Sequence, residues 1–356
     1  MKVIVGAGGT GGHLYPALAL VEYIKEVEPD SEFLFVGTKD RIESEVVPQQ
    51  GYEYIGLNVR GLVGNPIKKG IAAAIFVKSI FTAKKIVKKF KPDIVIGFGG
   101  YPSASVVEAA NRLGYKTMIH EQNSIIGLTN KILIKNVDKI VCCYDKAYEN
   151  FPKDKTYKLG NPRASVIASI KPDDIFKKYH LNKNLPLVTI VMGSLGSKSV
   201  NEMMLKSLKT FEQKNYQVLY VTGKPYFEEM KTKLGKLNKN IKLVPYIDDM
   251  PSVLKNTTLV VSRAGASTLA EITAVGIPAI LIPSPYVAAN HQEYNARELA
   301  DRNAAMMILE ENLNSKDFVE KVDYILENKI VQESMQKSAK ALGKPNACRD
   351  LSLIHI

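Results

Sequence analysis

The chain has 356 residues, more than the roughly 250–300 at which a single hydrophobic core stops growing, so its length predicts two domains. Its apolar content of 46% is that of a globular protein, and no apolar run reaches the roughly 18 residues of a membrane-spanning helix, which argues against an integral membrane protein. The formal charge of +12 predicts an anionic partner, but the chain has no Trp and no zinc-finger or helix-turn-helix signature, so we expect no nucleic acid partner.

The start of the chain and its cysteines both indicate a cytoplasmic protein. The first residues, MKVIVGAGG, enter a strand-like segment without the basic and apolar regions of a signal peptide. Of the three cysteines, Cys142 and Cys143 are adjacent in an apolar run. Their spacing suits neither a disulfide framework nor a metal site, so we expect the cysteines to fill the core.

Short β-branched runs alternate with amphipathic stretches along the whole chain, which predicts an α/β fold with parallel sheets flanked by helices. In the first half the predicted strands are Lys2–Val5, Glu32–Val36, Asp93–Gly97, Lys116–His120 and Lys139–Cys143. In the second half they are Leu187–Met192, Gln217–Val221, Ile241–Val244, Thr258–Ser262 and Ala279–Ile282. The sequence GNPR, which ends at Arg163, interrupts the pattern, so we predict domains of residues 1–163 and 164–356.

Glycines gather in four loops that follow predicted strands: Gly6–His13, Gly97–Ser103, Gly193–Ser197 and Arg263–Thr268. Glycine lets the backbone approach a ligand closely, and a helix that begins after it offers unpaired N–H groups to phosphate oxygens. In open parallel sheets, ligands bind beyond the carboxyl ends of the strands. The four loops therefore predict binding of more than one phosphate group.

The first loop contains a G-x-G-x-x-G pattern at Gly6, Gly8 and Gly11. A nicotinamide dinucleotide site also needs an acidic residue at the end of the second strand, but that strand ends in FVGT and Asp40 lies beyond it. A cradle for a pyrophosphate, with the imidazole of His13 beside it, fits the loop better.

His13 and Glu121 are the candidate general bases. Imidazole groups ordinarily titrate near neutral pH, which suits proton transfer from a substrate hydroxyl. The alternative for His13 is that it only caps the loop by bonding to backbone. Glu121, within the sequence HEQN, is the rival base. Its alternative role is to orient a substrate hydroxyl or a neighbouring side chain.

The segment SRAGASTLAEITAVGIP, which begins at Ser262, predicts a strand, a tight glycine turn and a helix capped by Ser267 or Thr268. The helix N-terminus can hold a diphosphate, and Arg263 can add positive charge. Glu271 lies one turn inside the helix, where its carboxylate can accept two hydrogen bonds from a ribose diol. The alternative for Glu271 is an interaction with the helix dipole only.

We predict no metal ion. No pair of aspartates lies at a strand end in a setting that would chelate one, and Asp248 and Asp249 precede Met-Pro in what is typical of a helix cap. The charge of a leaving group would then be neutralised by preorganised helix dipoles and Arg.

The segment Pro66–Lys91 has eight lysines and no acidic residue. One helical stripe should face the core and consists of Phe76, Ile80, Ala83, Val87 and Phe90. Other apolar residues fall among or beside the lysines, a pattern typical of a surface that rests on anionic lipid. The alternative is an ordinary solvated lysine face. The residues of the predicted membrane face are Ile71, Ile75, Val77, Phe81, Lys84, Lys85 and Lys88.

Seven motifs occur in one order along the chain: GAGGTGGH, GFGGYPS, HEQNSIIGLTNK, GNPR, YIDDM, SRAGASTLAEI and NHQEYNA. With these motifs the chain resembles the MurG family over essentially its whole length. That family transfers N-acetylglucosamine (GlcNAc) from UDP-GlcNAc to lipid I, which is undecaprenyl-pyrophosphoryl-N-acetylmuramyl-pentapeptide. The product is lipid II, the precursor of peptidoglycan.

The resemblance implies the GT-B fold, with two facing Rossmann-like domains, and an inverting reaction without metal or cofactor. It implies that the C-terminal half and a few N-terminal residues bind the donor: Thr10, Gly11, Gly12, Asn123, Arg163, Ser194, Ile247, Arg263, Ala264, Gly265, Ala266, Ser267, Thr268, Glu271 and Gln292. It implies that the acceptor binds to N-terminal loops: Gly11, Gly12, His13, Gly99, Gly100, Tyr101 and Ser103.

The resemblance further implies a peripheral protein at the cytoplasmic face of the bacterial plasma membrane, in contact with an anionic leaflet. The C4 hydroxyl of the acceptor sugar would attack the anomeric carbon, with His13 or Glu121 removing the proton. In some relatives one residue separates Pro from Arg in the GNPR motif, so the register of Arg163 differs. A closing helix that packs back on the N-terminal domain is expected of the family, but CRDLSLIHI at residues 348–356 lacks its amphipathic pattern.

Two alternatives share this architecture. One is a UDP-GlcNAc 2-epimerase, which would need several acids and bases around the sugar and would have no use for a basic lipid face. The other is a non-catalytic UDP-sugar-binding subunit at the membrane, whose loops would lack a titratable group aimed at the sugar.

Overall fold

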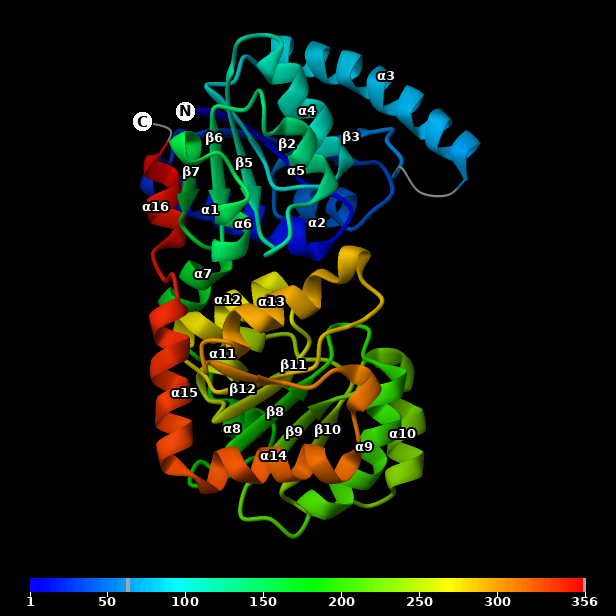
Figure 1. Ribbon diagram of the computed structural model, residues 1–356, viewed down its shortest axis with the longest axis vertical. Helices are drawn as coiled ribbons and strands as arrows, with labels where there is room; N and C mark the ends of the chain where they lie inside the picture. Colours follow the sequence, from blue (N-terminus) through cyan, green and yellow to red (C-terminus); the bar gives the residue numbers. More distant parts are fainter. Residues whose placement is uncertain (62–64, 355–356) are drawn as a thin grey trace. The chain divides into compact units, whose positions relative to one another are not determined.

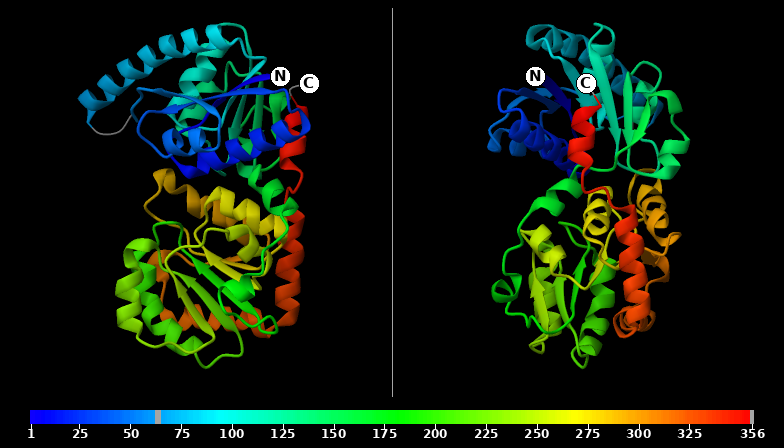
Figure 2. Two further views of the ribbon diagram at one scale, coloured as in Figure 1. Left: turned by 180° about the vertical axis from the view of Figure 1, so that it is seen from behind. Right: turned by 90° about the vertical axis from the view of Figure 1, so that its left-hand side faces the viewer.

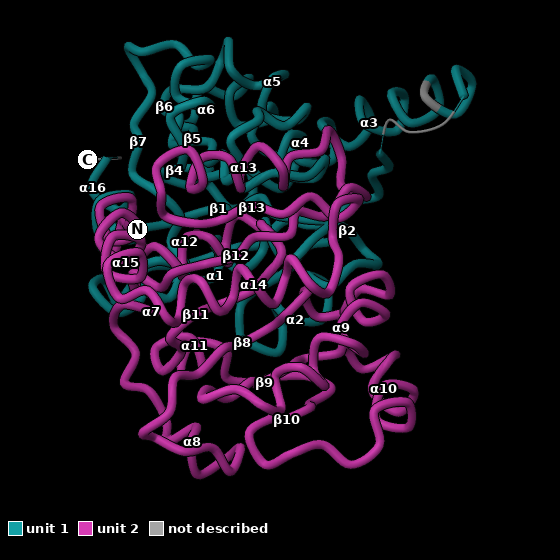
Figure 3. The backbone as a smooth tube through the Cα atoms, turned by 60° about the horizontal axis from the view of Figure 1, so that its bottom comes forward, with its two compact units in different colours: residues 1–165, 346–356 teal, residues 166–345 magenta. Residues whose placement is uncertain are grey.

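The computed structural model describes residues 1–61 and 65–354 (Figure 1). The chain folds into two compact units, the first made of Met1–Ser165 together with the chain end from Asn346, and the second of Val166–Pro345 (Figure 3). In each unit a parallel sheet lies between layers of helices, as Figure 2 shows from two sides. The predicted α/β class with two Rossmann-like domains is therefore confirmed.

The sheet of the first unit has seven parallel strands in the order β3-β2-β1-β4-β5-β6-β7. They are β1 (Lys2–Gly6), β2 (Glu32–Thr38), β3 (Glu53–Leu57), β4 (Ile94–Gly97), β5 (Lys116–Glu121), β6 (Lys139–Cys142) and β7 (Thr156–Lys158). All five strands predicted for this half are confirmed. The two that were missed, β3 and β7, are the edge strands, whose residues are mostly only partly buried, so they lack the continuous apolar run of a central strand.

Alternate residues of the central strands enter two different cores because both faces of the sheet are covered. On one face, Val3 and Val5 pack with residues of α1 (Gly11–Val27) and α2 (Glu43–Gln49). On the other face, Ile4 and Val36 pack against helices that lie farther along the chain. These are α3 (Pro66–Phe90), α4 (Tyr101–Asn111), α5 (Leu128–Leu133) and α6 (Asp145–Glu149).

The last helix of the described chain, α16 (Ala347–Leu353), belongs to the first unit. Ala347, Cys348 and Leu351 are fully buried, and Ala347 and Leu351 join the core formed by β1 and α1. The backbone N–H of Cys348 donates to Ser165 Oγ at 2.9 Å. Although CRDLSLIHI lacks the amphipathic pattern of the family's closing helix, its residues up to Leu353 form a helix that packs on the first unit. The helix is too short for a repeating apolar pattern, and a single buried edge stabilises it.

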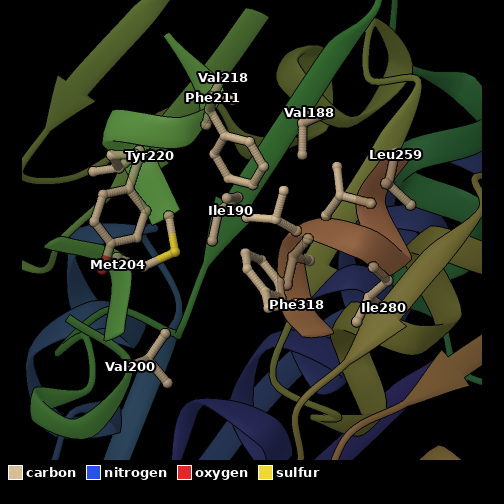
Figure 4. Close-up of a cluster of buried hydrophobic side chains, with 14 of the residues drawn as sticks. Val188, Ile190, Val200, Met204, Phe211, Val218, Tyr220, Leu259, Ile280 and Phe318 are labelled. Atoms are coloured by element: carbon tan, nitrogen blue, oxygen red, sulfur yellow. The ribbon is translucent and has the colours of Figure 1, made fainter. Parts of the chain in front are cut away.

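The sheet of the second unit has six parallel strands in the order β10-β9-β8-β11-β12-β13. They are β8 (Leu187–Val191), β9 (Gln217–Val221), β10 (Ile241–Val244), β11 (Leu259–Ser262), β12 (Ala279–Leu281) and β13 (Ala305–Met307). The five predicted strands are confirmed, and only β13, a three-residue edge strand, was missed. Figure 4 shows part of the core, where Val188, Ile190 and Tyr220 meet Phe211 and Phe318.

Helices cover both faces of this second sheet. They are α8 (Ile175–Lys178), α9 (Lys198–Phe211), α10 (Phe227–Leu234), α11 (Met250–Lys255), α12 (Ala266–Val275), α13 (His291–Ala300), α14 (Ser315–Glu327) and α15 (Lys329–Leu342). The remaining helix, α7 (Arg163–Ser169), contains the point at which the chain passes from the first unit to the second.

We predict that Leu351→Ala destabilises the first unit by about 2–4 kcal/mol, because truncating a fully buried leucine leaves a cavity. Leu353→Ala is a matched control on the same helix, since Leu353 is 55% exposed. Urea unfolding followed by circular dichroism measures both changes. Equal midpoints for the two variants would contradict the packing of α16 described here.

Candidate functional site

The four glycine loops lie at the two places where the strand order reverses. In the first unit these are the loops after β1 and β4, whose last residues, Gly6 and Gly97, are paired across the sheet. In the second unit they are the loops after β8 and β11, where Val191 pairs with Ser262. Neighbouring loops diverge from such a reversal to opposite faces of a sheet, which leaves a crevice where open α/β sheets bind ligands.

The helices that follow these loops begin without a side-chain cap. The N-cap residues of α1, α4, α9 and α12 make no side-chain cap hydrogen bond, and the first turns contain no acidic residue. Asn65, Asn314 and Asn328 do cap helices elsewhere, and Asp249 caps α11 as predicted. Uncapped first-turn N–H groups, at the positive end of a helix dipole, suit phosphate oxygens. The predicted cap of α12 by Ser267 or Thr268 is wrong, because its N-cap is Gly265.

In the first unit the two loops touch backbone to backbone. A Cβ atom on Gly100, which has φ of +83°, would lie 2.4 Å from the carbonyl oxygen of Gly8. A Cβ atom on Gly8 would lie 2.6 Å from Pro102 Cγ. Only glycine allows this approach, because real Cβ atoms are not found so close to other heavy atoms. The glycines are therefore required by the contact between the loops, in addition to any contact with a ligand.

His13 lies in the first turn of α1, and its ring contacts the backbone of both glycine loops. Its Nδ1 atom is 2.9 Å from the carbonyl oxygen of Gly8. Since a carbonyl only accepts hydrogen bonds, Nδ1 carries the proton and Nε2 carries the lone pair. A Cβ atom on Gly99 would lie 2.9 Å from Nε2, so the ring rests on the backbone of that residue. The two roles considered for His13, loop cap and general base, thus use different nitrogens: Nδ1 caps the loop, and Nε2 is available as a base.

Glu121, at the end of β5, is buried and fully engaged in hydrogen bonds. Its Oε1 atom accepts from the backbone N–H and the side-chain amide of Asn123, at 3.0 and 3.4 Å. Its Oε2 atom accepts from the N–H of Gly127 at 2.8 Å and the amide of Asn130 at 2.9 Å. With both oxygens taken by protein donors, the carboxylate matches the orienting role better than the role of base.

Ser103 does not lie on the surface of its loop. Its side chain is fully buried, and its Oγ atom accepts from the N–H of Gly99 at 3.3 Å. A Cβ atom on Gly97 would lie 2.6 Å from Ser103 Oγ. The prediction that Ser103 contacts the acceptor is therefore corrected: it supports the loop from beneath. Tyr101, two residues earlier at the start of α4, is half-buried.

His120 precedes Glu121 and is completely buried. Its Nε2 atom donates to the carbonyl of Gly160 at 2.9 Å, and its ring stacks on Phe98 with centroids 5.2 Å apart. Burial lowers the pKa of His120 from 6.5 to about 4, although the bond to Gly160 acts in the opposite direction. The side chain is therefore neutral at physiological pH and belongs to the core.

In the second unit the loop between β8 and α9 meets the loop after β9. A Cβ atom on Gly196 would lie 2.1 Å from the carbonyl oxygen of Thr222, and one on Gly223 would lie 2.5 Å from that of Leu195. Ser194 is exposed on this loop. Ile247, predicted to offer its backbone to uracil, is 3% exposed and follows β10.

Arg263, predicted to add charge for a diphosphate, is occupied by the protein. Its Nη1 atom donates to the carbonyl of Ile282 at 3.1 Å and pairs with Glu310 Oε2 at 2.5 Å. Its Nη2 atom donates to Ser197 Oγ at 2.8 Å. The guanidinium charge is matched by Glu310, so Arg263 ties the two glycine loops of this unit to each other. This role within the protein was not predicted, and a contact of Arg263 with a phosphate stays a prediction.

Two further predicted donor residues of this unit are Glu271 on α12 and Gln292 at the start of α13, whereas Arg163 belongs to the first unit. Glu271 lies inside the helix and is 7% exposed, and Gln292 Oε1 accepts from the N–H of Ser284 at 2.9 Å. Asn295, which we did not predict, is buried and donates to the carbonyl of Ala264 at 3.3 Å, so it holds the turn before α12. Arg163 begins α7, where its N–H donates to Asn161 Oδ1 at 3.0 Å.

Helix α3 carries the predicted membrane face. Its stripe of Ile80, Ala83 and Val87 is buried, with Phe76 and Phe90 partly buried, as predicted. On the opposite side Ile71 and Val77 are each 53% exposed and Phe81 is 61% exposed. Lys85 and Lys88 are exposed, whereas Ile75 and Lys84 are half-buried. The first half of α3 extends beyond the sheet (Figure 1).

Membrane-spanning helices and metal sites are two further features to consider in the described residues. Within residues 1–61 and 65–354, no helix is long and apolar enough to cross a membrane. In the same part of the chain, no group of three or more His, Cys, Asp or Glu side chains is placed to hold a metal ion.

Comparison with known proteins relates both units to glycosyltransferases. Residues 3–142 match the glycosyltransferase family 28 N-terminal domain, and residues 187–351 match the C-terminal domain of the same family. The chain is 41% identical over 362 residues to the "UDP-N-acetylglucosamine–N-acetylmuramyl-(pentapeptide) pyrophosphoryl-undecaprenol N-acetylglucosamine transferase" of Limosilactobacillus reuteri, covering 100% of this chain and 98% of that protein.

Solved structures give the same relationship. Acinetobacter baumannii MurG is 27% identical, with a TM-score of 0.81 over 98% of this chain and 97% of that one. A putative UDP-N-acetylglucosamine 2-epimerase from Listeria monocytogenes has a TM-score of 0.73 but is 15% identical, over 99% of this chain and 94% of that one. The likeness to the epimerase shows the fold alone.

We predict that His120 makes the first unit sensitive to acid. Its pKa of about 4 in the folded state lies below the value of 6.5 in the unfolded chain, so its stabilising contribution is present above pH 6.5 and is lost as the pH falls toward 4. The loss is on the order of 3 kcal/mol. In His120→Gln the amide can still donate to Gly160 but does not titrate.

Urea unfolding at pH 7 and pH 4.5 measures this effect. The wild type should exceed His120→Gln in free energy of unfolding at pH 7, and the difference should shrink at pH 4.5. A difference that stays the same at both pH values would overturn the prediction. His180→Asn, on an exposed residue, should follow the wild type throughout.

Proposed function

We propose that this chain, which belongs to the MurG family of glycosyltransferase family 28, transfers GlcNAc from UDP-GlcNAc to lipid I, giving lipid II and UDP. The observation that carries the proposal is the construction of the first unit's site, where the free Nε2 of His13 lies between two glycine loops. The identity of the sugar and of the acceptor follows from the full-length relationship to transferases named for this reaction.

We assign the donor to the loops of the second unit. The uncapped N-terminus of α12 offers N–H groups to the diphosphate, and the exposed Ser194 can add a hydroxyl donor. Glu271 can accept hydrogen bonds from the ribose diol, and Gln292 lies at the start of α13 for the sugar. Arg263 serves indirectly, since its guanidinium holds these loops in place.

We assign proton removal to His13. Its Nε2 takes the proton of the acceptor's C4 hydroxyl as the oxygen attacks the anomeric carbon of GlcNAc. The bond from that carbon to the UDP oxygen breaks on the opposite face, which inverts the configuration. The departing diphosphate gains negative charge, and helix N-termini aimed at it stabilise that charge without a metal ion. Glu121 acts as a positioning residue, because it orders the loop that carries Asn123.

Both alternatives are weaker. The 2-epimerase alternative has only likeness of fold in its favour, at 15% identity, whereas the relatives of 41% identity are transferases. The alternative of a non-catalytic subunit leaves unexplained why an imidazole with a free nitrogen lies on the contact between the two loops.

We further propose that the protein rests peripherally on the anionic cytoplasmic leaflet of the plasma membrane through α3. Four large apolar side chains, those of Ile67, Ile71, Val77 and Phe81, are exposed on a helix with basic residues and no acidic ones. Apolar burial in the headgroup region and attraction of lysines to anionic lipid would act together there. Such an anchor would bring the loops of the first unit to a substrate that is itself held in the membrane.

We predict transfer of labelled GlcNAc from UDP to a lipid I analogue in the presence of EDTA. His13→Asn should fold normally but lower kcat by roughly 100- to 10,000-fold, the range that general base catalysis contributes. His180→Asn is the matched control, since His180 is exposed in the second unit. Absence of transfer by the wild type would refute the proposed function, and an unchanged kcat in His13→Asn would refute only the role of His13.

We predict that Phe81→Asp weakens binding to vesicles that contain phosphatidylglycerol, because it removes an exposed aromatic ring and adds a like charge to that of the lipid. Ile330→Asp adds the same charge at a residue of α15 that is 81% exposed, and should leave binding unchanged. Co-sedimentation at low and high salt measures both. Activity on a short-chain soluble acceptor should survive in both variants. Equal binding by the two variants would reject α3 as the membrane face.

A further inference from the structure

We infer that Glu43 is a positioning residue for His13 and acts through the single peptide group that joins Gly8 to Gly9. The inference rests on the proposed function, in which His13 is the base. Glu43 lies on a different helix from His13 and outside every motif that relates the chain to its family. Three sets of contacts support the assignment.

The first set is the environment of the Glu43 carboxylate. Glu43 is the first residue of α2 and is 0% exposed. Its Oε1 atom accepts from the N–H of Thr38 at 3.0 Å and from the Thr38 hydroxyl at 2.7 Å. It also accepts from the N–H of Gly9, at 3.1 Å to Oε1 and 3.2 Å to Oε2. Burying a carboxylate is costly unless it is well hydrogen-bonded, and these bonds to Thr38 and Gly9 offset that cost.

The second set lies at the two ends of the Gly8–Gly9 peptide group. Its N–H donates to Glu43, and its C=O accepts from His13 Nδ1 at 2.9 Å. A negative charge at the N–H end polarises the group and places more negative charge on the carbonyl oxygen. That oxygen then holds the Nδ1 proton more firmly and stabilises the imidazolium that forms when Nε2 takes a proton. A carboxylate that orients a base directly has the same effect in other enzymes.

The third set fixes the peptide group in space. A Cβ atom on Gly8 would lie 2.8 Å from Glu43 Oε1, and a Cβ atom on Gly100 would lie 2.4 Å from the Gly8 oxygen. The peptide therefore fills the gap between the carboxylate and the second loop. Tyr54 is a titratable group close enough to feel the charges of Glu43 and Asp40. Burial, and then the charges of Glu43 and Asp40, raise the pKa of Tyr54, so this phenol stays neutral.

Glu43→Gln tests the inference, because it preserves size and one acceptor oxygen but removes the charge. We expect kcat for GlcNAc transfer to fall roughly tenfold or more, within the range that general base catalysis contributes. The KM for UDP-GlcNAc should change little. The acidic limb of the pH profile of kcat/KM should move to lower pH, since the imidazolium loses stabilisation. Glu43→Asp retains the charge and should restore the position of that limb even at a lower rate.

Asp138→Asn is the matched control. Asp138 also accepts from the N–H and the hydroxyl of a threonine, Thr117, at 2.8 and 2.9 Å, but where β5 begins, at the opposite end of the strands. The same loss of charge there should leave kcat and the pH profile unchanged. A double variant, Glu43→Gln with His13→Asn, should be no slower than His13→Asn alone, because Glu43 acts through His13.

The outcomes separate the inference from the function on which it rests. If the wild type transfers GlcNAc but Glu43→Gln matches it in rate and pH profile, the positioning role is rejected. If Glu43→Gln and Glu43→Asp both lower kcat with the acidic limb unmoved, or if the double variant is slower than His13→Asn alone, Glu43 has a purely structural role. If circular dichroism shows that Glu43→Gln does not fold, the pH profile of Glu43→Asp decides. Because Glu43→Asp retains the charge, an acidic limb displaced from its wild-type position rejects the inference. If the wild type shows no transfer at all, the proposed function itself fails.

Discussion

The backbone contact between the β1–α1 loop and the β4–α4 loop is the constraint on which the first unit's site depends. Gly6 and Gly97 end paired strands, and α4 approaches both so closely that Cβ atoms there would collide with Ser103. Because of this approach, the Gly8 carbonyl contacts the β4–α4 loop. His13 can then bond to that carbonyl and rest on Gly99 at the same time. The direction of Nε2, the nitrogen of the proposed base, therefore follows from the packing of a helix on two strand ends.

The second unit has the same arrangement of loops at its strand reversal but holds them in another way. There a guanidinium crosses from one loop to the other, with Ser197, Ile282 and Glu310 as its partners. A partly buried ion pair stabilises a fold only when further hydrogen bonds satisfy its remaining atoms, as they do for Arg263. The uncapped end of α12 offers the positive potential of backbone dipoles beside a guanidinium whose charge is already matched by Glu310.

Much of the fold and part of the site could be predicted because the signals are local. Buried strands show as apolar runs, and the loops at the strand reversals show as glycine clusters, so the place of His13 was evident. The roles of Glu43, Ser103 and Glu310 could not be predicted, because each depends on a partner brought near by tertiary packing. The partners of Arg263 within the protein were not predicted for the same reason. The sequence of α16 lacks an amphipathic pattern, and its buried edge is evident only in its packing against α1.

Glycine creates a difficulty for catalysis as well as an opportunity. A loop without side chains can approach a ligand, but its backbone has more freedom to lose than that of any other residue, so it does not by itself hold a base in one direction. In the first unit, hydrogen bonds to side chains of neighbouring helices remove this backbone freedom. The Gly9 N–H is held by Glu43, the Gly99 N–H by Ser103, and the Gly8 carbonyl by His13. The loops can therefore be small and rigid, because two of the groups that immobilise them, Glu43 and Ser103, are buried and lie on neighbouring helices.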